Sequence, residues 1–281
     1  MKRTALIFTA IIFFISNSAG SRRLSAQQTF VERLTAHNRT MSARQPSFMT
    51  PLVGTDPRLV QYTKFSVSHQ YTSTGTETVN YGNGRGTGII VGDRFEFDFM
   101  APPYIQHNGA AEDGFGDTAV LAKYRIASEN REGGNYDVAF ALGHCFATGS
   151  HKNGATTDSF APTLAAGYAF HRVDVISSLG GTLPTGKIAT QGRAIAWNTV
   201  SQAHLKPHVW FEVGNNATYL LGGSHDGKMQ NFITPAAFYI IRGKNWKATH
   251  PTFIVDGGMQ IATSGFHTYN HNLITELRML F

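Results

Sequence analysis

The last ten residues, 272–281, read NLITELRMLF and alternate between two kinds of side chain. Side chains of a β-strand point to opposite faces in turn, so strict alternation predicts a strand with one apolar face. A cytosolic domain usually ends in a frayed, polar tail. This chain instead ends on an aromatic residue, as though its terminus were embedded. The apolar positions are Leu273, Leu277, Met279 and Phe281, whereas Asn272, Glu276 and Arg278 lie between them and Ile274 and Leu280 break the pattern.

The same two-residue period recurs along most of the chain. The stretch RFEFDFM (94–100) alternates charged residues with phenylalanines, and YDVAFALGHCFA (136–147) alternates large apolar residues with small or polar ones. Most such segments reach the roughly 9–11 residues that a tilted strand needs to cross a bilayer. The sequence predicts twelve strands: 64–72, 86–92, 94–101, 116–127, 135–147, 158–170, 173–183, 197–205, 208–221, 229–241, 252–263 and 271–281.

The connections between these strands alternate in length. Long, glycine-rich loops are expected at 73–85, 102–115, 148–157, 184–196, 222–228 and 264–270, with mostly shorter turns between them. Outer-membrane barrels combine long external loops with short periplasmic turns, and an even strand count puts both termini in the periplasm. We therefore predict an all-β fold, a transmembrane antiparallel β-barrel of about 12 strands. A secreted β-sandwich also alternates, but its apolar faces cover a core instead of carrying large aromatic residues throughout.

The N-terminus has the features of a secretion signal. Lys2 and Arg3 precede the apolar stretch Ala5–Ile15, which is too short to span a bilayer, and small residues follow. We predict a signal peptide over residues 1–26, with cleavage near 19–26. Residues 27–60 are then an N-terminal periplasmic or plug segment, and residues 61–281 form the barrel.

The composition excludes several classes of protein. Only 15% of the 281 residues are charged, and the formal net charge is +6. No stripe of interleaved basic and aromatic residues suggests nucleic-acid binding. Cys145 is the single cysteine in the sequence, so it cannot form an intrachain disulfide.

Charged residues on the predicted strands define the candidate lumen. An Arg or Lys on the lipid face near the midplane would cost about 2–4 kcal/mol, so such groups are expected to point inward. They could form an ion-pair network that makes the barrel rigid, or they could line a water path that selects solutes. Alternation assigns to the lumen Lys64, Arg94, Glu96, Asp98, Lys123, Arg125, Glu212, Glu276 and Arg278.

Three patterns suggest other chemistry, and each has a simpler interpretation. GTLPTGKI (181–188) approaches a P-loop, but Ile188 replaces the metal-binding hydroxyl and no helical pattern follows. The histidines are scattered, so we predict no metal site, and we predict no cofactor. Ser264, His267 and Asn270 are close in sequence without a recognisable nucleophile motif, and no catalytic residues are assigned.

From GFGD (114–117) onward the chain resembles the outer-membrane β-barrel family named for the MetA pathway of phenol degradation. The resemblance covers most of residues 60–281, and Lys187 departs from the acidic residue expected after PTG. It implies a transporter-like barrel that passes small compounds, often hydrophobic or aromatic ones, and it supplies no catalytic residues. The matching motifs are Gly114–Asp117, LPTG (183–186), Asn198, FEVGNNATY (211–219), Gly227–Lys228, TPAA (234–237) and the ending YNHN…RMLF.

Together these features predict a porin-like channel in the outer membrane of a Gram-negative bacterium. It would contact outer-membrane lipids, pass small-molecule solutes passively and bind no nucleic acid. Leu277, Met279 and Phe281 mark the C-terminal strand as the targeting signal for the barrel-assembly machinery. The alternatives are a lipid-modifying barrel enzyme and a structural or surface-binding barrel.

Overall fold

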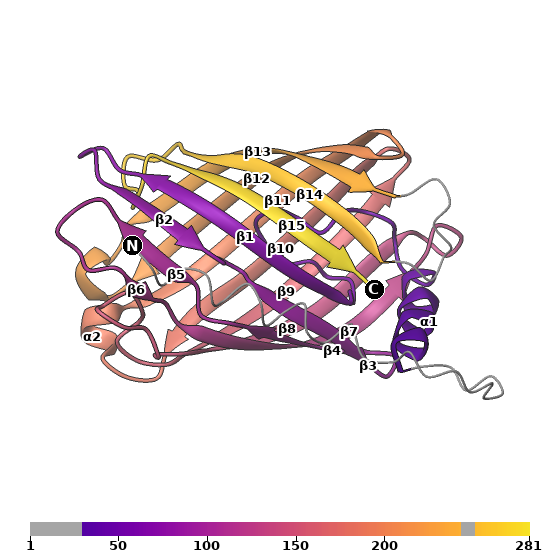
Figure 1. Ribbon diagram of the computed structural model, residues 1–281, viewed down its shortest axis with the longest axis horizontal. Coiled ribbons are helices and arrows are strands. Elements are labelled where there is room, and N and C mark those ends of the chain that lie inside the picture. Colours follow the sequence, from indigo (N-terminus) through magenta and orange to yellow (C-terminus); the bar gives the residue numbers. More distant parts are fainter. Residues whose placement is uncertain (1–29, 243–250) are drawn as a thin grey trace, which may run out of the picture.

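A computed structural model describes residues 30–242 and 251–281, and it is a closed antiparallel β-barrel (Figure 1). Each strand pairs with its neighbours in chain order, and the last strand pairs with the first over ten residues, from Tyr62↔Leu280 to Tyr71↔His271. Closure of this kind leaves no free sheet edge. It also excludes the β-sandwich, because a sandwich consists of two separate sheets.

Twelve strands form the wall of the barrel, and three of them are interrupted. These three strands are each built from two consecutive segments, namely β2 with β3, β4 with β5, and β6 with β7. Fifteen segments therefore make twelve strands. The predicted number is confirmed. The segments are β1 (Tyr62–Tyr71), β2 (Glu77–Tyr81), β3 (Gly86–Val91), β4 (Phe95–Met100), β5 (Tyr104–His107), β6 (Gly114–Phe115), β7 (Thr118–Glu129), β8 (Tyr136–Phe146), β9 (Ser159–Phe170), β10 (Val173–Pro184), β11 (Arg193–Lys206), β12 (Val209–Leu221), β13 (Met229–Ile241), β14 (Thr252–Ala262) and β15 (His271–Leu280).

Two of the ranges predicted to be long loops contain strands instead, so these two predictions were wrong. The range 73–85 contains β2, and 102–115 contains β5 and β6. β2 reads ETVNY, and its residues are neither strongly apolar nor cleanly alternating. It is a strand because its backbone pairs with β1, a tertiary contact that hydrophobic periodicity does not report.

The wall is apolar outside and polar inside. Phe95, Phe97 and Phe99 on β4 are half exposed, while Glu96 and Asp98 between them are buried. The last strand follows the same rule, because Leu273 and Leu277 are exposed and Glu276 and Arg278 are buried. Contiguous apolar surface of this extent is a lipid-facing surface, since soluble proteins rarely expose it.

The two ends of the barrel differ. One end, here called the turn end, carries the start of β1, the end of β15 and the turns 92–94, 130–135, 171–172 and 207–208. The loop end carries longer connections, including the short helices α2 (Ile188–Gln191) and η2 (Gly223–His225). Helix α1 (Phe30–Ser42) lies at the turn end beside the C-terminus (Figure 1).

The predicted signal peptide lies outside the described residues, as does most of the connection 242–251 between the predicted strands 229–241 and 252–263. Among the helices that the structure describes, none is both long and apolar enough to cross a membrane.

The lipid-facing surface can be tested at Leu179, which points outward from the middle of β10 and is 56% exposed. Leu179→Arg should destabilise the folded barrel in lipid by about 2–4 kcal/mol, because it places a charge in the hydrocarbon layer. Urea titration of the protein in phospholipid vesicles measures the difference, with Leu179→Ala as the uncharged control. Equal stability of the two variants would contradict a transmembrane position for Leu179.

Candidate functional site

The lumen is occupied by residues 43–60, here called the lumen segment, which connect α1 to β1 without forming helix or strand over most of their length. Its contacts come from strands all around the wall, among them β4, β7, β9, β11, β12, β14 and β15. Phe48, Met49 and Leu59 of this segment are almost fully buried. The segment therefore crosses the interior of the barrel.

Gln202 and Glu212 bind the first part of the lumen segment through its backbone. The Gln202 side chain accepts a hydrogen bond from the Met49 N–H and donates one to the Met49 carbonyl, both at 3.0 Å. Glu212 Oε1 accepts from the Leu52 N–H at 3.1 Å, and its Oε2 accepts from Gln202 at 2.8 Å. These contacts satisfy peptide groups that have no strand partner, which would otherwise be costly to bury.

Arg278 binds the two residues that lie between Met49 and Leu52. Its guanidinium donates to the Thr50 carbonyl at 2.6 Å and to the Pro51 carbonyl at 3.3 Å. The same group pairs with Glu276 and, at 3.2 Å, with Asp256. Arg278 is buried, and its charge is compensated by two carboxylates while its remaining N–H groups reach the segment.

Lys123 and Glu96 bind the end of the segment. Lys123 Nζ donates to Glu96 at 2.8 Å and to the Arg58 carbonyl at 2.9 Å, and Glu96 also accepts from the Val60 N–H. This pair is buried on β7 and β4. The wall thus contacts backbone groups of the segment from Met49 to Val60 on several sides.

Apolar contacts fix the same segment. Phe48 packs with Ala169, Ile176 and Val200, and Met49 packs in a second cluster with Trp210, Ala236, Phe238 and Ile254. Two wall glycines make room for it. A Cβ at Gly167 would lie 2.6 Å from Phe48 Cζ, and a Cβ at Gly258 would lie 2.7 Å from Leu52 Cδ2.

Hydrogen bonds and an ion pair within the lumen segment connect its first residues to its last ones. Arg58 donates to both oxygens of Asp56, at 3.1 and 2.7 Å, and Thr50 donates to Asp56 at 2.6 Å. Burial alone would raise the pKa of the Asp56 carboxyl, but the neighbouring Arg58 and Lys123 charges outweigh it and hold that pKa below its usual range. Gln45 closes the loop through two hydrogen bonds to the Leu59 backbone.

Helix α1 is attached across the turn end. Asn38 donates to the carbonyl of Phe281 at 2.6 Å, and Gln61 donates to the same oxygen at 3.1 Å. On the far side, Ser128 and Asn130 donate to the carbonyls of Arg44 and Ala43. Phe281, the residue after β15, thus contributes a backbone contact to the N-terminal region.

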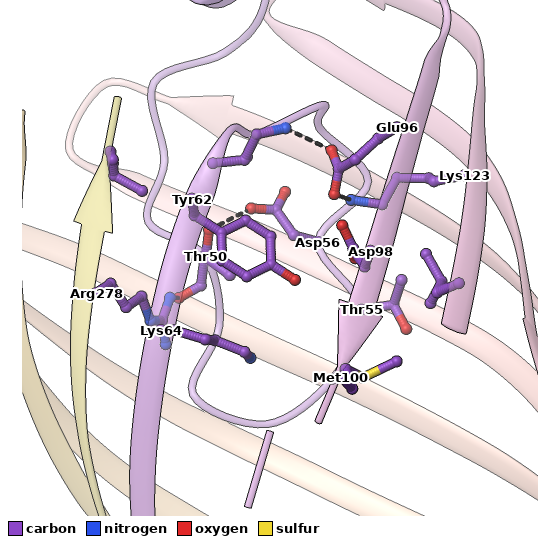
Figure 2. A pocket seen from close by; sticks show the side chains of 14 residues that line it. Thr50, Thr55, Asp56, Tyr62, Lys64, Glu96, Asp98, Met100, Lys123 and Arg278 are labelled. Atoms are coloured by element: carbon purple, nitrogen blue, oxygen red, sulfur yellow. Dashed lines mark hydrogen bonds and ion pairs between the residues drawn. The ribbon is translucent and has the colours of Figure 1, made fainter. Parts of the chain in front are cut away.

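A cavity of about 140 Å³ remains between the lumen segment and the wall (Figure 2). Tyr62, Lys64, Asp98 and Met100 line it from the wall, and Thr55 and Asp56 line it from the segment. Tyr62 and Asp98 crowd Gly88 between them, since a Cβ there would lie within 2.5 Å of both side chains. A second cavity, of about 150 Å³, lies between α1 and the segment and includes Ser42, Pro46 and Leu59.

The structure turns eight of the nine candidate lumen residues inward. Seven of them, Glu96, Asp98, Lys123, Arg125, Glu212, Glu276 and Arg278, are buried, and Lys64 is partly buried beside Glu276. Arg94 is the exception, and its predicted position in the lumen was wrong. It lies in the exposed turn 92–94, where alternation no longer applies, and donates to the Tyr124 hydroxyl at 3.1 Å.

The buried polar residues of the lumen that were not among the candidates include Asp137, Asp174, Gln202 and Asp256. Asp137 and Asp174 lie between apolar neighbours on their strands, so the same parity rule could have found them. Gln202 follows Ser201 and Asp256 precedes Gly257, so alternation is weaker there. No feature of the sequence indicated that Gln202 would bind the backbone of Met49.

Beyond the lumen segment, towards the loop end, a group of inward residues is neutral. Asn216 donates to Asn198 at 2.9 Å and accepts from Thr234 at 2.7 Å, while Asn272 and Tyr269 both donate to Gln260 at 2.9 Å. The charged residues named above thus lie in the turn-end half of the barrel, and a belt of amides and hydroxyls lies above them.

Ser264, His267 and Asn270 do not form a nucleophile and base pair. The Ser264 hydroxyl donates to the Phe266 carbonyl at 2.7 Å and accepts from the Asn231 N–H. The two ring nitrogens of His267 bond to the Ser264 carbonyl and to Asn270. A general base has to reach the proton that it removes, and here His267 contacts the backbone of Ser264 and not its hydroxyl.

Comparison with known proteins places the fold. No family model and no curated protein matches the chain. Among solved structures, the chain is similar to the COG4313 outer membrane channel from Pseudomonas putida F1, with a TM-score of 0.53 and 13% identity, covering 84% of this chain and 99% of that one. It is also similar to the NanC porin, with a TM-score of 0.51 and 9% identity, covering 77% and 98%. The chain has the fold of an outer-membrane β-barrel. Its resemblance to the MetA-pathway family stays a prediction.

The buried Lys123–Glu96 pair offers a test of how the segment is held. Lys123→Met should destabilise the protein by about 3–5 kcal/mol, because it leaves the buried Glu96 carboxyl without its cationic partner. Adding Glu96→Gln should recover part of this loss, since the amide oxygen still accepts from Val60. Both are measured by urea unfolding in lipid vesicles.

The exposed pair Arg44–Asp93, at 3.8 Å, is the matched control, and Asp93→Asn should change stability by less than about 1 kcal/mol. If Lys123→Met were as mild as Asp93→Asn, the buried pair would not hold the segment.

Proposed function

We propose that this protein is an outer-membrane channel for the passive passage of small solutes, and that residues 43–60 act as a plug that has to move before solutes pass. The observation that carries the proposal is the set of hydrogen bonds from wall side chains to the backbone of the lumen segment. Such bonds can be exchanged for water without breaking a strand or opening the wall. The segment can therefore leave while the barrel stays closed.

The fold supports the channel half of this proposal. Both similar structures with TM-scores above 0.5 are described as a porin or an outer membrane channel. A twelve-stranded barrel is wider than an eight-stranded one, whose interior side chains fill. The extra width here accommodates the lumen segment and the two cavities beside it.

The solute class in this proposal follows the sequence resemblance and includes hydrophobic and aromatic small compounds. The apolar clusters that receive Phe48 and Met49 support it, because they would become accessible to a solute when the segment withdraws. The lipid-modifying enzyme is disfavoured by the contacts of Ser264 and His267.

Assembly and export complete the proposal. A signal within residues 1–26 would direct the chain across the inner membrane, and the strand carrying Leu277, Met279 and Phe281 would be recognised by the barrel-assembly machinery in a Gram-negative cell. Outer-membrane lipids would then contact the exposed apolar face.

A reversible tether tests the plug directly. A Cβ at Gly54 would lie 3.5 Å from Asn198 Cβ, within the range that a disulfide spans. In the full chain with Cys145→Ser, the pair Gly54→Cys and Asn198→Cys should keep planar bilayers silent when oxidised. Reduction should restore channel openings, because the segment can then move away from β11.

Cys145→Ser alone, measured with and without reductant, controls for effects on the membrane. Gly54 has a φ of 120°, which disfavours a side chain by about 1–3 kcal/mol, so mass analysis has to establish that the bond forms. Equal conductance of the oxidised and reduced forms would rule out the plug. Silence of both forms and of the control would rule out the channel.

A further inference from the structure

We propose that the wall pocket now filled by Phe48 and Arg58 is the solute-binding site of the lumen, and that it takes an amphiphilic organic cation, an ammonium or guanidinium group joined to an aromatic or alkyl body. This inference rests on the proposed function, because a solute reaches the pocket only when the lumen segment withdraws.

The floor of the pocket is apolar and shaped for a ring. Ala169, Ile176 and Val200 on three successive strands are buried around Phe48. Gly167 lies directly under the ring, where any side chain would collide with it. Withdrawal of Phe48 would expose this surface, and an aromatic or alkyl group of similar size would cover it again.

Two carboxylates flank this floor. Asp137 is 0% exposed and lies opposite Gly167 in the register of β8 and β9, and Asp174 is 3% exposed and lies opposite Ala169 in the register of β9 and β10. The Ser128 hydroxyl shares its one proton between Oδ2 of Asp137, at 2.9 Å, and the Arg44 carbonyl, at 3.1 Å. Within the described part of the chain, the buried Asp137 Oδ1 and Asp174 Oδ2 have no hydrogen-bond donor.

The lumen segment brings a cation, Arg58, to this pocket, where it also pairs with Asp56. Arg58 attracts Asp174, and it attracts Asp137 less than the wall residue Arg125 does. The Arg58 guanidinium carbon lies 4.4 Å from the centre of the Phe48 ring. Phe48 and Arg58 together place an aromatic ring beside a positive charge. The pocket is therefore occupied by the two groups that an arylalkyl cation combines in one molecule.

Withdrawal of the segment would remove Arg58 together with its partner Asp56, so that Asp174 would lose its attracting cation and Asp137 would keep only the wall residue Arg125. Burying an unpaired charge is costly, so a solute that brings a cation is favoured over a neutral one of the same shape, and an anion is repelled. The rest of the wall adds to this preference. The buried charged side chains of the described strands are seven carboxylates (Glu96, Asp98, Asp137, Asp174, Glu212, Asp256, Glu276) against three cations (Lys123, Arg125, Arg278), with partly buried Lys64 as a fourth.

The test empties the pocket in the full chain and asks what refills it. In Phe48→Ala/Arg58→Ala, benzylammonium should bind in detergent solution at neutral pH, as measured by calorimetry. Benzyl alcohol and benzoate carry the same ring with no charge and with a negative charge. We expect each to bind at least about tenfold more weakly, the factor that corresponds to ~1.4 kcal/mol.

Adding Asp137→Asn and Asp174→Asn should abolish the preference for benzylammonium. The matched control, Glu129→Gln/Glu132→Gln, changes two exposed carboxylates near the neighbouring turn and should leave it intact. Equal binding of the three probes, or a preference that survives Asp137→Asn/Asp174→Asn, would overturn the assignment.

If the emptied variant does not fold, the wild-type chain provides the second measurement. Benzylammonium should block single-channel current at concentrations where benzoate does not, and an equal effect of both would again overturn the assignment. Binding in detergent does not require conductance, so loss of the cation site and loss of the channel function are separate outcomes.

Discussion

The structure depends on one constraint, which is that peptide groups inside a closed barrel need hydrogen-bond partners. The backbone N–H and C=O groups of the wall strands are hydrogen-bonded to neighbouring strands, so they are not free to bind a chain that passes through the lumen. Side chains supply the partners instead. Gln202, Glu212, Arg278, Lys123 and Glu96 reach inward and bind the backbone between Met49 and Val60.

This arrangement explains why the charged lumen residues have mixed signs. Peptide carbonyls need donors and peptide N–H groups need acceptors, so a wall that holds a backbone needs both Arg or Lys and Glu. Two of the buried cations are also paired with carboxylates, Lys123 with Glu96 and Arg278 with Glu276 and Asp256. The wall residues therefore act neither as a simple cross-lumen network nor as the lining of an open water path while the segment is in place.

Shape complements charge in the same region. The wall carries glycine where Phe48 and Leu52 approach it, at Gly167 and Gly258, and small alanines line much of the inner face of β8 and β9. Small inward residues on these strands are consistent with a water-filled lumen when read from the sequence. In the folded protein they are the space into which the lumen segment packs. The neutral amide belt above it has no such occupant among the described residues.

By itself the sequence determined the barrel and its strand number, because the two-residue period of a strand is a local property. It also determined the direction of most charged side chains, because a charge that faced the lipid would be costly. The terminal stretch Leu273–Phe281 indicated closure for the same reason. Only the tertiary structure decided what the inward charges bind. Residues 43–60 have no period, since their conformation follows from partners on many strands far away in sequence. The strand segments β2 and β5 and the exposed position of Arg94 were likewise set by backbone pairing and turn placement, which side-chain alternation does not encode.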